Sequence, residues 1–478
     1  MKKIIIIGLL ITAVTSFSQD FVKKINFKIN KGSSVFQIVE EDKKQFSFFF
    51  SDENNVKSIK FNDKFEVLDS LSSTRPEDKY NDIAGYSITG NKYYTYWFTS
   101  NNKEIGAQCF DFDKKDVWTE DIKIELLREK IIKKITINNV FYIITILKNT
   151  NILNFYVFKE GKLEKKSIDL SDKNFINDEG KASDFWDVLN SNSFIESSLS
   201  VQNIMSDTPP SIALAAKKRK IYTDKNNLIF TSDVSVNFTQ ILTINLTNFT
   251  TDLKSINQSY YEIEEYKPIK SNSFLLGDKL LQIKNNPDRL TLQFKDLEGN
   301  EIKNYEVLAD TQIPFKNSEI IQENGTVKST RILDKTNQLV RKISNLYPGI
   351  SCYVKNDKTY LTLGAVSEVQ SNNSGAMIGG MLGGFTGSLI GVALSSNYSV
   401  DNLNSYANRK VVYINCLFDN KLEHLDGVIN KLPIDNLRAF SEENPDYQFK
   451  TIFKLNNELI FGGYEKKKKE YSFFKFKD

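Results

Sequence analysis

Few side chains of this chain have the type and spacing that catalysis requires. His424 is the only histidine, so a site with several histidine ligands is excluded, and a nucleophile–histidine–acid triad would have to use this residue. Its surroundings, Leu422-Glu-His-Leu-Asp-Gly427, are typical of an exposed hairpin edge. The G-x-S-x-G, dinucleotide-binding and phosphate-binding glycine motifs are absent. The sequence therefore predicts no metal and no cofactor, and it identifies no catalytic residue.

The acidic residues offer two weaker hypotheses. Asp111, Asp113 and Asp116 could bind calcium, but the glycine and the distal glutamate of a calcium loop are missing, which favours a polar turn. A glycosidase needs only two carboxylates about 5 to 10 Å apart, and the 60 acidic residues do not single out such a pair. The aromatic run from Tyr93 to Phe98 could stack on sugars, although a central strand of the core is the commoner setting for such a run.

The charge balance argues against nucleic acid as a partner. A formal net charge of +3 over 478 residues creates no global field that would attract a polyanion. We interpret the basic runs Lys217–Lys220 and Lys466–Lys469 as solvated loops. The three cysteines are too few and too scattered for a disulfide framework or a structural zinc site, although one pair could form a bridge. The chain is therefore expected to fold by its hydrophobic core.

One segment, between Glu368 and Asp401, contains no charged residue and has a regular glycine spacing. Residues four apart lie on one face of an α-helix, so a helix here would have one bare face and one apolar face. The two faces comprise Gly375, Gly379, Gly383, Gly387 and Gly391, and Met377, Met381, Phe385 and Leu389. This glycine zipper lies in an expected insertion, residues 371–400, and it predicts contact with a membrane surface or a protein partner through residues 375–394.

An isolated zipper helix would not be stable in water, because each helical glycine costs about 0.8–1 kcal/mol relative to alanine. Small residues at every fourth position allow close helix packing in lipid, and about 20 helical residues span the roughly 30 Å of a hydrocarbon core. A single crossing would place the C-terminal strands on the far side of the membrane. We therefore expect a re-entrant segment, a surface helix or packing in a homo-oligomer, and a flexible glycine-rich loop is the alternative.

The N-terminus has the pattern of a secretory signal peptide. Lys2 and Lys3 precede an apolar run from Ile4 to Val14, and small residues follow up to Ser18. We predict that residues 1–18 are removed and that the protein is exported to the periplasm, the outer envelope or the extracellular space.

A pattern of four strands recurs along the rest of the chain. Two apolar strands are followed by a hairpin whose turn contains Asn, Asp or Gly, and the pattern returns about every 45 to 55 residues, as in the blades of a β-propeller. The units begin near Val35, Tyr86, Ile131, Lys220, Phe274, Ser351 and Gln448. The expected outer hairpins span 58–67, 109–118, 155–163, 244–249, 292–302 and 413–422. The last unit has only three strands, and residues 22–29 could supply the fourth and close the ring.

The sequence thus predicts an all-β, β-propeller-like domain over residues 19–478 with about seven four-stranded blades. Six or eight blades, or two unrelated β-sandwich domains, are the alternatives. Apolar residues at helical spacing predict short helical insertions over 183–205 and 330–346.

The function favoured at this point is that of an exported, non-enzymatic binding or scaffold protein of the bacterial cell envelope, which makes contact through the zipper. The alternative is a carboxylate-dependent glycan hydrolase or lyase that uses the central channel of the propeller.

Overall fold

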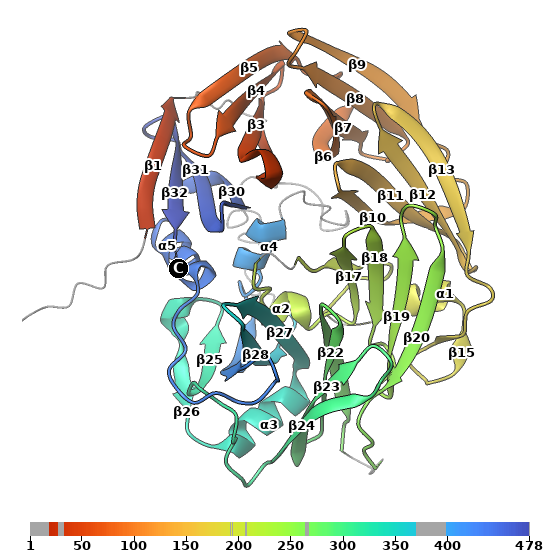
Figure 1. The fold of residues 1–478 in the computed structure, drawn as a ribbon, viewed down its shortest axis with the longest axis vertical. Helices are drawn as coiled ribbons and strands as arrows, with labels where there is room; N and C mark the ends of the chain where they lie inside the picture. The colour runs from red at the N-terminus through yellow and green to blue at the C-terminus, as the bar shows by residue number, and fades with distance from the viewer. Residues whose placement is uncertain are drawn as a thin grey trace, which may run out of the picture.

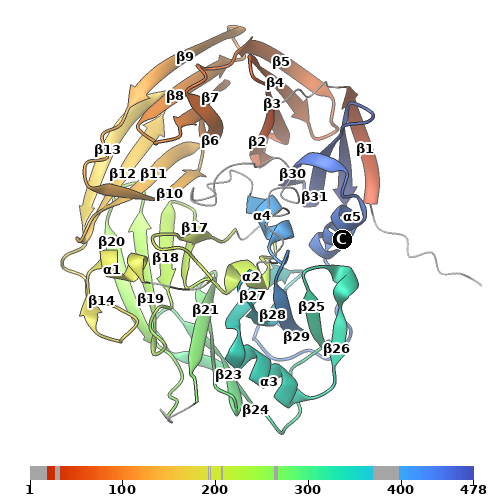
Figure 2. The same ribbon diagram turned by 180° about the vertical axis from the view of Figure 1, so that it is seen from behind.

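The structure is a computed structural model that describes residues 19–26, 33–191, 193, 195–205, 208–262, 267–369 and 398–477. Sheets of four or five strands follow one another around a common centre (Figures 1 and 2). Seven such sheets and one two-stranded ribbon account for the described strands. The expectation of an all-β, β-propeller-like fold is therefore confirmed.

The first three sheets are antiparallel meanders in which each strand pairs with the next one along the chain. They contain β2 (Ser34–Glu40), β3 (Gln45–Ser51), β4 (Asn55–Asn62) and β5 (Val67–Thr74); β6 (Tyr80–Thr89), β7 (Lys92–Thr99), β8 (Glu104–Asp111) and β9 (Asp116–Lys123); and β10 (Glu129–Ile137), β11 (Val140–Leu147), β12 (Ile152–Lys159) and β13 (Lys162–Asp169). Figure 1 shows β6 and β10 toward the centre, and β5, β9 and β13 at the periphery.

The fourth and fifth sheets repeat this order, and the fourth gains a short parallel strand on its inner side. Their strands are β16 (Gln202–Asn203), β17 (Arg219–Asp224), β18 (Asn227–Ser232), β19 (Phe238–Asn245) and β20 (Thr251–Asn257); and β21 (Lys270–Leu276), β22 (Lys279–Asn285), β23 (Arg289–Asp296) and β24 (Glu301–Leu308). The ribbon of β14 (Phe175–Ile176) and β15 (Ala182–Ser183) precedes the fourth sheet, together with helices α1 (Phe185–Asn190) and α2 (Ile212–Ala215).

The sixth sheet departs from the meander. Its order is β26-β25-β29-β28-β27, with β25 (Ile320–Asn324), β26 (Arg331–Leu333), β27 (Tyr347–Lys355), β28 (Lys358–Val366) and β29 (Lys410–Phe418). The outer hairpin expected over 413–422 forms only as a short turn with a bridge between Phe418 and His424, because β25 from earlier in the chain supplies the outer strand that pairs with β29. The remaining short elements are η1 (Glu41–Lys43), η2 (Val327–Ser329), α3 (Thr336–Asn345), α4 (Tyr398–Asn404) and α5 (Pro433–Glu443).

The N-terminal strand completes the seventh sheet, as the sequence predicts. This sheet has the order β1-β32-β31-β30, with β1 (Gln19–Asn26), β30 (Tyr447–Leu455), β31 (Glu458–Glu465) and β32 (Glu470–Phe476). Aromatic side chains join it to the first sheet, since the rings of Phe48 and Phe473 have centroids 5.2 Å apart and those of Phe46 and Phe453 are 5.1 Å apart. Both ends of the described chain therefore share one sheet.

The Asn- and Asp-rich turns explain why the strand pattern is visible in the sequence. Two-residue hairpin turns of type I′ need positive φ at both positions, a conformation that Asn and Asp tolerate better than most residues. The backbone has this conformation at Asn138-Asn139 (φ 49° and 62°), Asn356-Asp357 (50° and 58°) and Asn456-Asn457 (52° and 63°). All seven unit starts predicted from the sequence lie within strands, which are β2, β6, β10, β17, β21, β27 and β30.

The two expected helical insertions are shorter than predicted. Among the described residues of 183–205, helix is confined to α1 (Phe185–Asn190), because the backbone leaves the helical conformation at Ser191 (φ −54°, ψ 132°) and because Gln202–Asn203 pairs with β17. Within 330–346, the strand β26 precedes the helix α3, which begins only at Thr336. The start of this helix is capped by Gln338 Oε1, which accepts the main-chain N–H groups of Asp334 and Lys335.

Residues 1–18 and 370–397 lie outside the described part of the chain. The signal peptide and the contact through the zipper residues 375–394 therefore remain predictions. The strands on either side of the zipper, β28 and β29, pair directly with each other. Among the described residues, no helix is both long enough and apolar enough to cross a bilayer.

Candidate active site

A run of four basic residues, Lys217-Lys218-Arg219-Lys220, lies at the start of β17 and points into the protein rather than into solvent. Lys220 is 0% exposed and Arg219 is 1% exposed, while Lys217 and Lys218 are partly buried. The interpretation of this run as a solvated loop is therefore wrong, whereas the second basic run, at Lys466–Lys469, is exposed as expected. The difference arises because the first run connects two buried segments, the helix α2 and the strand β17.

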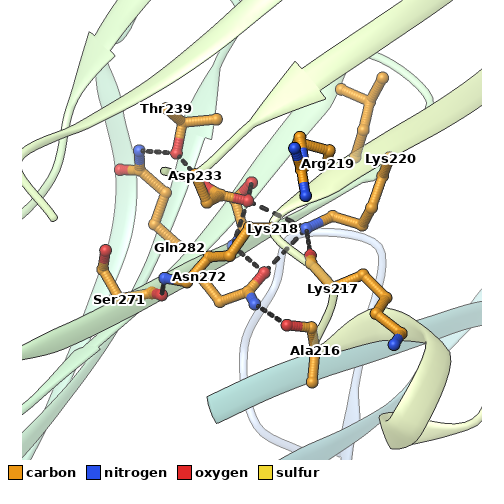
Figure 3. Close-up of polar contacts among 12 residues, drawn as sticks. Ala216, Lys217, Lys218, Arg219, Lys220, Asp233, Thr239, Ser271, Asn272 and Gln282 are labelled. Carbon is orange, nitrogen blue, oxygen red and sulfur yellow. Dashed lines mark hydrogen bonds and ion pairs between the residues drawn. The ribbon is translucent and has the colours of Figure 1, made fainter. Parts of the chain in front are cut away.

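Lys220 forms a buried ion pair with Asp233 (Figure 3). Its Nζ donates to Asp233 Oδ2 at 2.9 Å, to Asn272 Oδ1 at 2.8 Å and to the main-chain oxygen of Lys217 at 2.7 Å. Asp233 in turn accepts from Thr239 Oγ1 at 2.8 Å and from the N–H and hydroxyl of Ser273. All three ammonium donors are used, so Lys220 holds its neighbours in place.

Arg219 connects the segment that contains Leu189, Glu196 and Ser197 to the fourth sheet through hydrogen bonds. Its Nε donates to Glu196 Oε1 at 2.9 Å, and its two Nη atoms donate to the main-chain oxygens of Leu189 and Ser197. The other carboxylate oxygen of Glu196 accepts the main-chain N–H of Lys218 at 2.9 Å. Both oxygens of Glu196 are therefore occupied.

The Lys218 side chain is also held by the protein. Its Nζ donates to the main-chain oxygen of Ser271 on β21, as Figure 3 shows. Burial lowers the pKa of the Lys218 ammonium to about 8, the negative charge of Asp233 opposes this shift, and the positive charge of Lys220 adds to it.

Lys217 differs from the other three residues of the run. Its ammonium makes no hydrogen bond and no ion pair with the described residues, and Figure 3 shows its side chain directed away from the Lys220–Asp233 pair. Burial lowers the pKa of this ammonium to about 8, and the positive charge of Arg409 lowers it further. The negative charge of the Glu196 carboxylate opposes the shift. A larger fraction of the Lys217 side chains is therefore neutral near pH 8 than for a lysine with the ordinary pKa.

Arg409 is the second partly buried cation beside this site. One guanidinium N–H, from Nη1, donates to the main-chain oxygen of Ser367 at 2.8 Å, and no carboxylate of the described chain forms an ion pair with Arg409. Burial lowers the pKa of Arg409, and the charge of the exposed Glu368 opposes that shift. Glu368 itself accepts a hydrogen bond from the Tyr347 hydroxyl at 2.8 Å.

Helices α2 and α4 connect Lys217 to the segment that carries Arg409. Asn402 Oδ1 accepts the main-chain N–H of Ser211 at 2.6 Å, and Asn402 Nδ2 donates to the main-chain oxygen of Pro209 at 2.9 Å. The hydroxyls of Ser405 and Ser211 lie 2.7 Å apart. Figures 1 and 2 both place α2 and α4 near the centre of the ring. We refer to these contacts as the α2–α4 clasp.

Two further lysines on β10 have lowered pKa values. Burial lowers the pKa of Lys133 to about 8, opposed by the charge of Asp401 in α4. Burial alone lowers the pKa of Lys134 to about 7. The Lys134 ammonium lies 3.5 Å from the centroid of the Phe98 ring and donates to Asn102 Oδ1 at 2.7 Å. Burial therefore lowers the pKa of lysines on the inner strand β10 as well as that of Lys217 and Lys218 before β17.

The other residues considered from the sequence do not meet at this site. His424 Nε2 lies 3.0 Å from Asn317 Oδ1 and is partly buried rather than exposed. Asp111 Oδ1 accepts the main-chain N–H groups of Asp113 and Lys114, which confirms the polar turn. The aromatic run from Tyr93 to Phe98 forms the buried strand β7, as expected for core residues.

Lysine and arginine, rather than a facing pair of carboxylates, supply the uncompensated charges described here at the inner edge of the fourth sheet. The described residues contain no group of three or more His, Cys, Asp or Glu side chains that could hold a metal ion. The three cysteines are free and buried.

No known protein family matches this chain, and no curated protein is significantly similar to it in sequence. Solved structures similar in fold include a variant of the Synechocystis apocarotenoid oxygenase (9% identity, 57% of this chain and 59% of that chain, TM-score 0.28). The cobalt-substituted form of that enzyme matches with 9% identity over 59% of this chain and 62% of that chain, at a TM-score of 0.28. A chimera of the enzyme with RPE65 matches with 8% identity, the same two coverages and a TM-score of 0.28.

These matches correct the function favoured by the sequence. The matched structures are of enzymes, and this finding contradicts the expectation of a non-enzymatic binding or scaffold protein. The chain covers less than two thirds of the length of the matched chains. TM-scores of 0.28 and identities of 8–9% carry no argument about the reaction, the substrate or a metal of this protein, so these must be argued from its own residues.

Proposed function

We propose that the protein is an enzyme that uses the amine of Lys217 as a nucleophile toward a carbonyl compound. The observation that carries this proposal is the contrast within the basic run. Lys218, Arg219 and Lys220 each donate hydrogen bonds to the protein, whereas the Lys217 ammonium has no partner among the described residues and a pKa of about 8.

The chemistry follows from the state of this amine. A protonated lysine has no lone pair to donate, and a surface lysine with a pKa near 10.4 is almost entirely protonated at neutral pH. Burial and a neighbouring cation both favour the neutral amine, which is the usual way in which proteins activate a lysine for Schiff-base formation. The neutral Lys217 amine would add to the carbonyl carbon to give a carbinolamine. Loss of one water from the carbinolamine, with uptake of one proton from solvent, would leave an iminium ion that withdraws electrons from the adjacent bond.

The residues around Lys217 would orient and tune this amine. The 2.7 Å hydrogen bond from Lys220 fixes the main chain of Lys217, and the Glu196 carboxylate fixes the next peptide N–H. Arg409 keeps positive charge near the amine, which disfavours its protonation. These contacts fix the main chain that carries the reactive side chain and leave the reacting nitrogen of Lys217 unengaged.

Reductive trapping tests the proposal. The purified protein is incubated at pH 8 with acetaldehyde or glyoxylate and cyanoborohydride, which delivers hydride to an iminium carbon and leaves a stable secondary amine. Peptide mapping then gives the ratio of label at Lys217 to label at the exposed Lys466 of the same sample. We expect a ratio of at least about ten with one of the aldehydes, because the neutral fraction of Lys217 is far larger than that of a lysine with the ordinary pKa.

Two variants complete the test. Lys217→Gln should abolish the selective label, and Lys466→Gln should leave the label at Lys217 unchanged. If Lys217 is labelled no more than Lys466 with either aldehyde, the protein does not use this amine. If the label goes to Lys218 instead, the nucleophile has been assigned to the wrong residue.

Export is a separate proposal. Residues 1–18 have the charged, apolar and small-residue regions of a signal peptide. A mature N-terminus at Gln19, measured by mass spectrometry on protein from the periplasm or medium, would support export. Intact Met1 in all of the cellular protein would contradict it.

Contact through residues 375–394 is also a proposal. A glycine face lets two backbones approach closely in lipid or in a homo-oligomer, so Gly383→Leu with Gly387→Leu should reduce liposome flotation or oligomer size. A wild-type protein that neither floats nor oligomerises would contradict this contact.

A further inference from the structure

We infer that the carbonyl compound bound at Lys217 carries a carboxylate, and that Arg409 is the residue that recognises it. This inference rests on the function proposed above and adds the substrate class, a small oxo acid. It also assigns Arg409 as a specificity residue, distinct from the nucleophile.

The first argument is the excess of positive charge. Lys217 and Arg409 are both partly buried, and neither forms an ion pair with the described residues. Charges removed from water are costly unless an opposite charge compensates them. The charge of Arg409 acts on Lys217, so two cations that form no ion pair with the described residues are best explained by an anion that is not part of the described chain.

The nearby acidic side chains do not fill this role. Both oxygens of Glu196 are used by Arg219 and by the main chain of Lys218. Glu368 is exposed, and its Oε1 accepts the Tyr347 hydroxyl. The sequence between Glu368 and Asp401 contains no charged residue, so this insertion offers no carboxylate to either cation.

The second argument is the geometry of the guanidinium. Arg409 uses Nη1 for the main-chain oxygen of Ser367 at 2.8 Å, which anchors one end of the group. Its remaining N–H groups have no partner among the described residues. A planar guanidinium with free N–H groups is suited to two parallel hydrogen bonds with a carboxylate.

The third argument is the fixed relation of the two segments. The α2–α4 clasp ties Ser211, a few residues before Lys217, to Asn402 and Ser405, a few residues before Arg409. The two cations are thereby carried by one supported unit. A ligand with an electrophilic carbon and an anionic group could contact both.

The trapping experiment with two aldehydes tests this inference. Glyoxylate and acetaldehyde differ in that a carboxylate replaces a methyl group. For each aldehyde the label at Lys217 is divided by the label at Lys466 in the same sample, which removes the intrinsic reactivity of the aldehyde. The wild-type protein should prefer glyoxylate by about tenfold on this scale, the factor that corresponds to about 1.4 kcal/mol.

Arg409→Gln should bring this preference close to one. Loss of the cation also shifts the pKa of Lys217, but that shift affects labelling by both aldehydes alike and cancels in the preference. Arg341→Gln, at an exposed arginine of α3, is the matched control and should keep the preference. Equal selective labelling by both aldehydes, or a preference that survives Arg409→Gln, would overturn the role of Arg409 while leaving Lys217 as the nucleophile. Absence of selective labelling by either aldehyde would overturn the proposed function and this inference together.

Discussion

Lys220 donates a 2.7 Å hydrogen bond from Nζ to the main-chain oxygen of Lys217, so a fully buried ammonium positions the residue whose own ammonium has no partner among the described residues. The same Lys220 Nζ neutralises Asp233. One side chain thus joins the buried ion pair to the candidate nucleophile.

Lys220→Met should lower the free energy of unfolding by about 3–5 kcal/mol, because it leaves the Asp233 carboxylate buried without its cation. Urea unfolding measures this loss, with Lys466→Met as the matched control at an exposed lysine, expected to change stability by less than about 0.5 kcal/mol. A Lys220→Met protein as stable as the wild type would show that the ion pair is not a supporting element of the site.

The α2–α4 clasp makes a second prediction. Asn402→Ala removes the partners of the Ser211 N–H and the Pro209 oxygen, and it should cost about 1–3 kcal/mol of unfolding free energy. It should also reduce selective labelling of Lys217, since α2 leads directly into that residue. Asn404→Ala, two residues further along α4, should have little effect on either measurement. Full labelling in Asn402→Ala would show that the clasp does not position Lys217.

Stability should rise with pH between about 7 and 9.5. Burial lowers the pKa of Lys134 to about 7 and those of Lys133, Lys217 and Lys218 to about 8, whereas an unfolded lysine titrates near 10.4. The unfolded chain therefore binds more protons in this window, and the free energy of unfolding increases as pH rises. The destabilising effect is complete below the folded pKa values and disappears above the unfolded one.

Lys134→Met isolates one part of this pH dependence. The variant should be more stable than the wild type at pH 7 and should show a smaller rise in stability toward pH 9.5, as measured by urea midpoints at the two pH values. Lys130→Met, at an exposed lysine of the same strand, is the control. Parallel pH profiles for wild type and Lys134→Met would mean that the Lys134 amine titrates normally.

Closure of the ring by β1 gives a further prediction. Residues Gln19 to Asn26 pair with β32 from Phe476 to Glu470, and Val22 and Ile25 pack on the core of the first and seventh sheets. Deletion of residues 19–26 should lower the free energy of unfolding by at least about 3 kcal/mol, given about 1.5–3 kcal/mol for each buried aliphatic side chain. Lys24→Ala, which removes only an exposed ion pair, should be nearly neutral. An unchanged urea midpoint after the deletion would contradict closure by β1.

The strands could be predicted from the sequence because their signals are local. The turns at Asn138-Asn139 and Asn456-Asn457 need only the backbone preferences of Asn, and the alternating apolar residues determine which segments form strands. The origin of β25 in the sixth sheet could not be predicted, since strand order between distant segments leaves no local pattern.

The candidate site could not be predicted for a different reason. A basic run is usually solvated, and the burial of Lys217–Lys220 depends on Asp233, Asn272 and Glu196, which are distant in sequence. One local feature of the sequence indicated that this run is buried. The run directly joins the apolar residues 212–216 to the apolar strand at Ile221.

Competitive labelling of the amines with acetic anhydride as a function of pH tests most directly whether Lys217 is an activated amine. Acylation requires the neutral form, so the extent of labelling at each lysine follows its own titration. We predict that Lys217 reaches half of its maximal reactivity near pH 8, below the value of about 10.4 for a lysine in an unfolded chain. A Lys217 amine that reaches half of its maximal reactivity only near the unperturbed lysine value of about 10.4 would contradict the proposed active site.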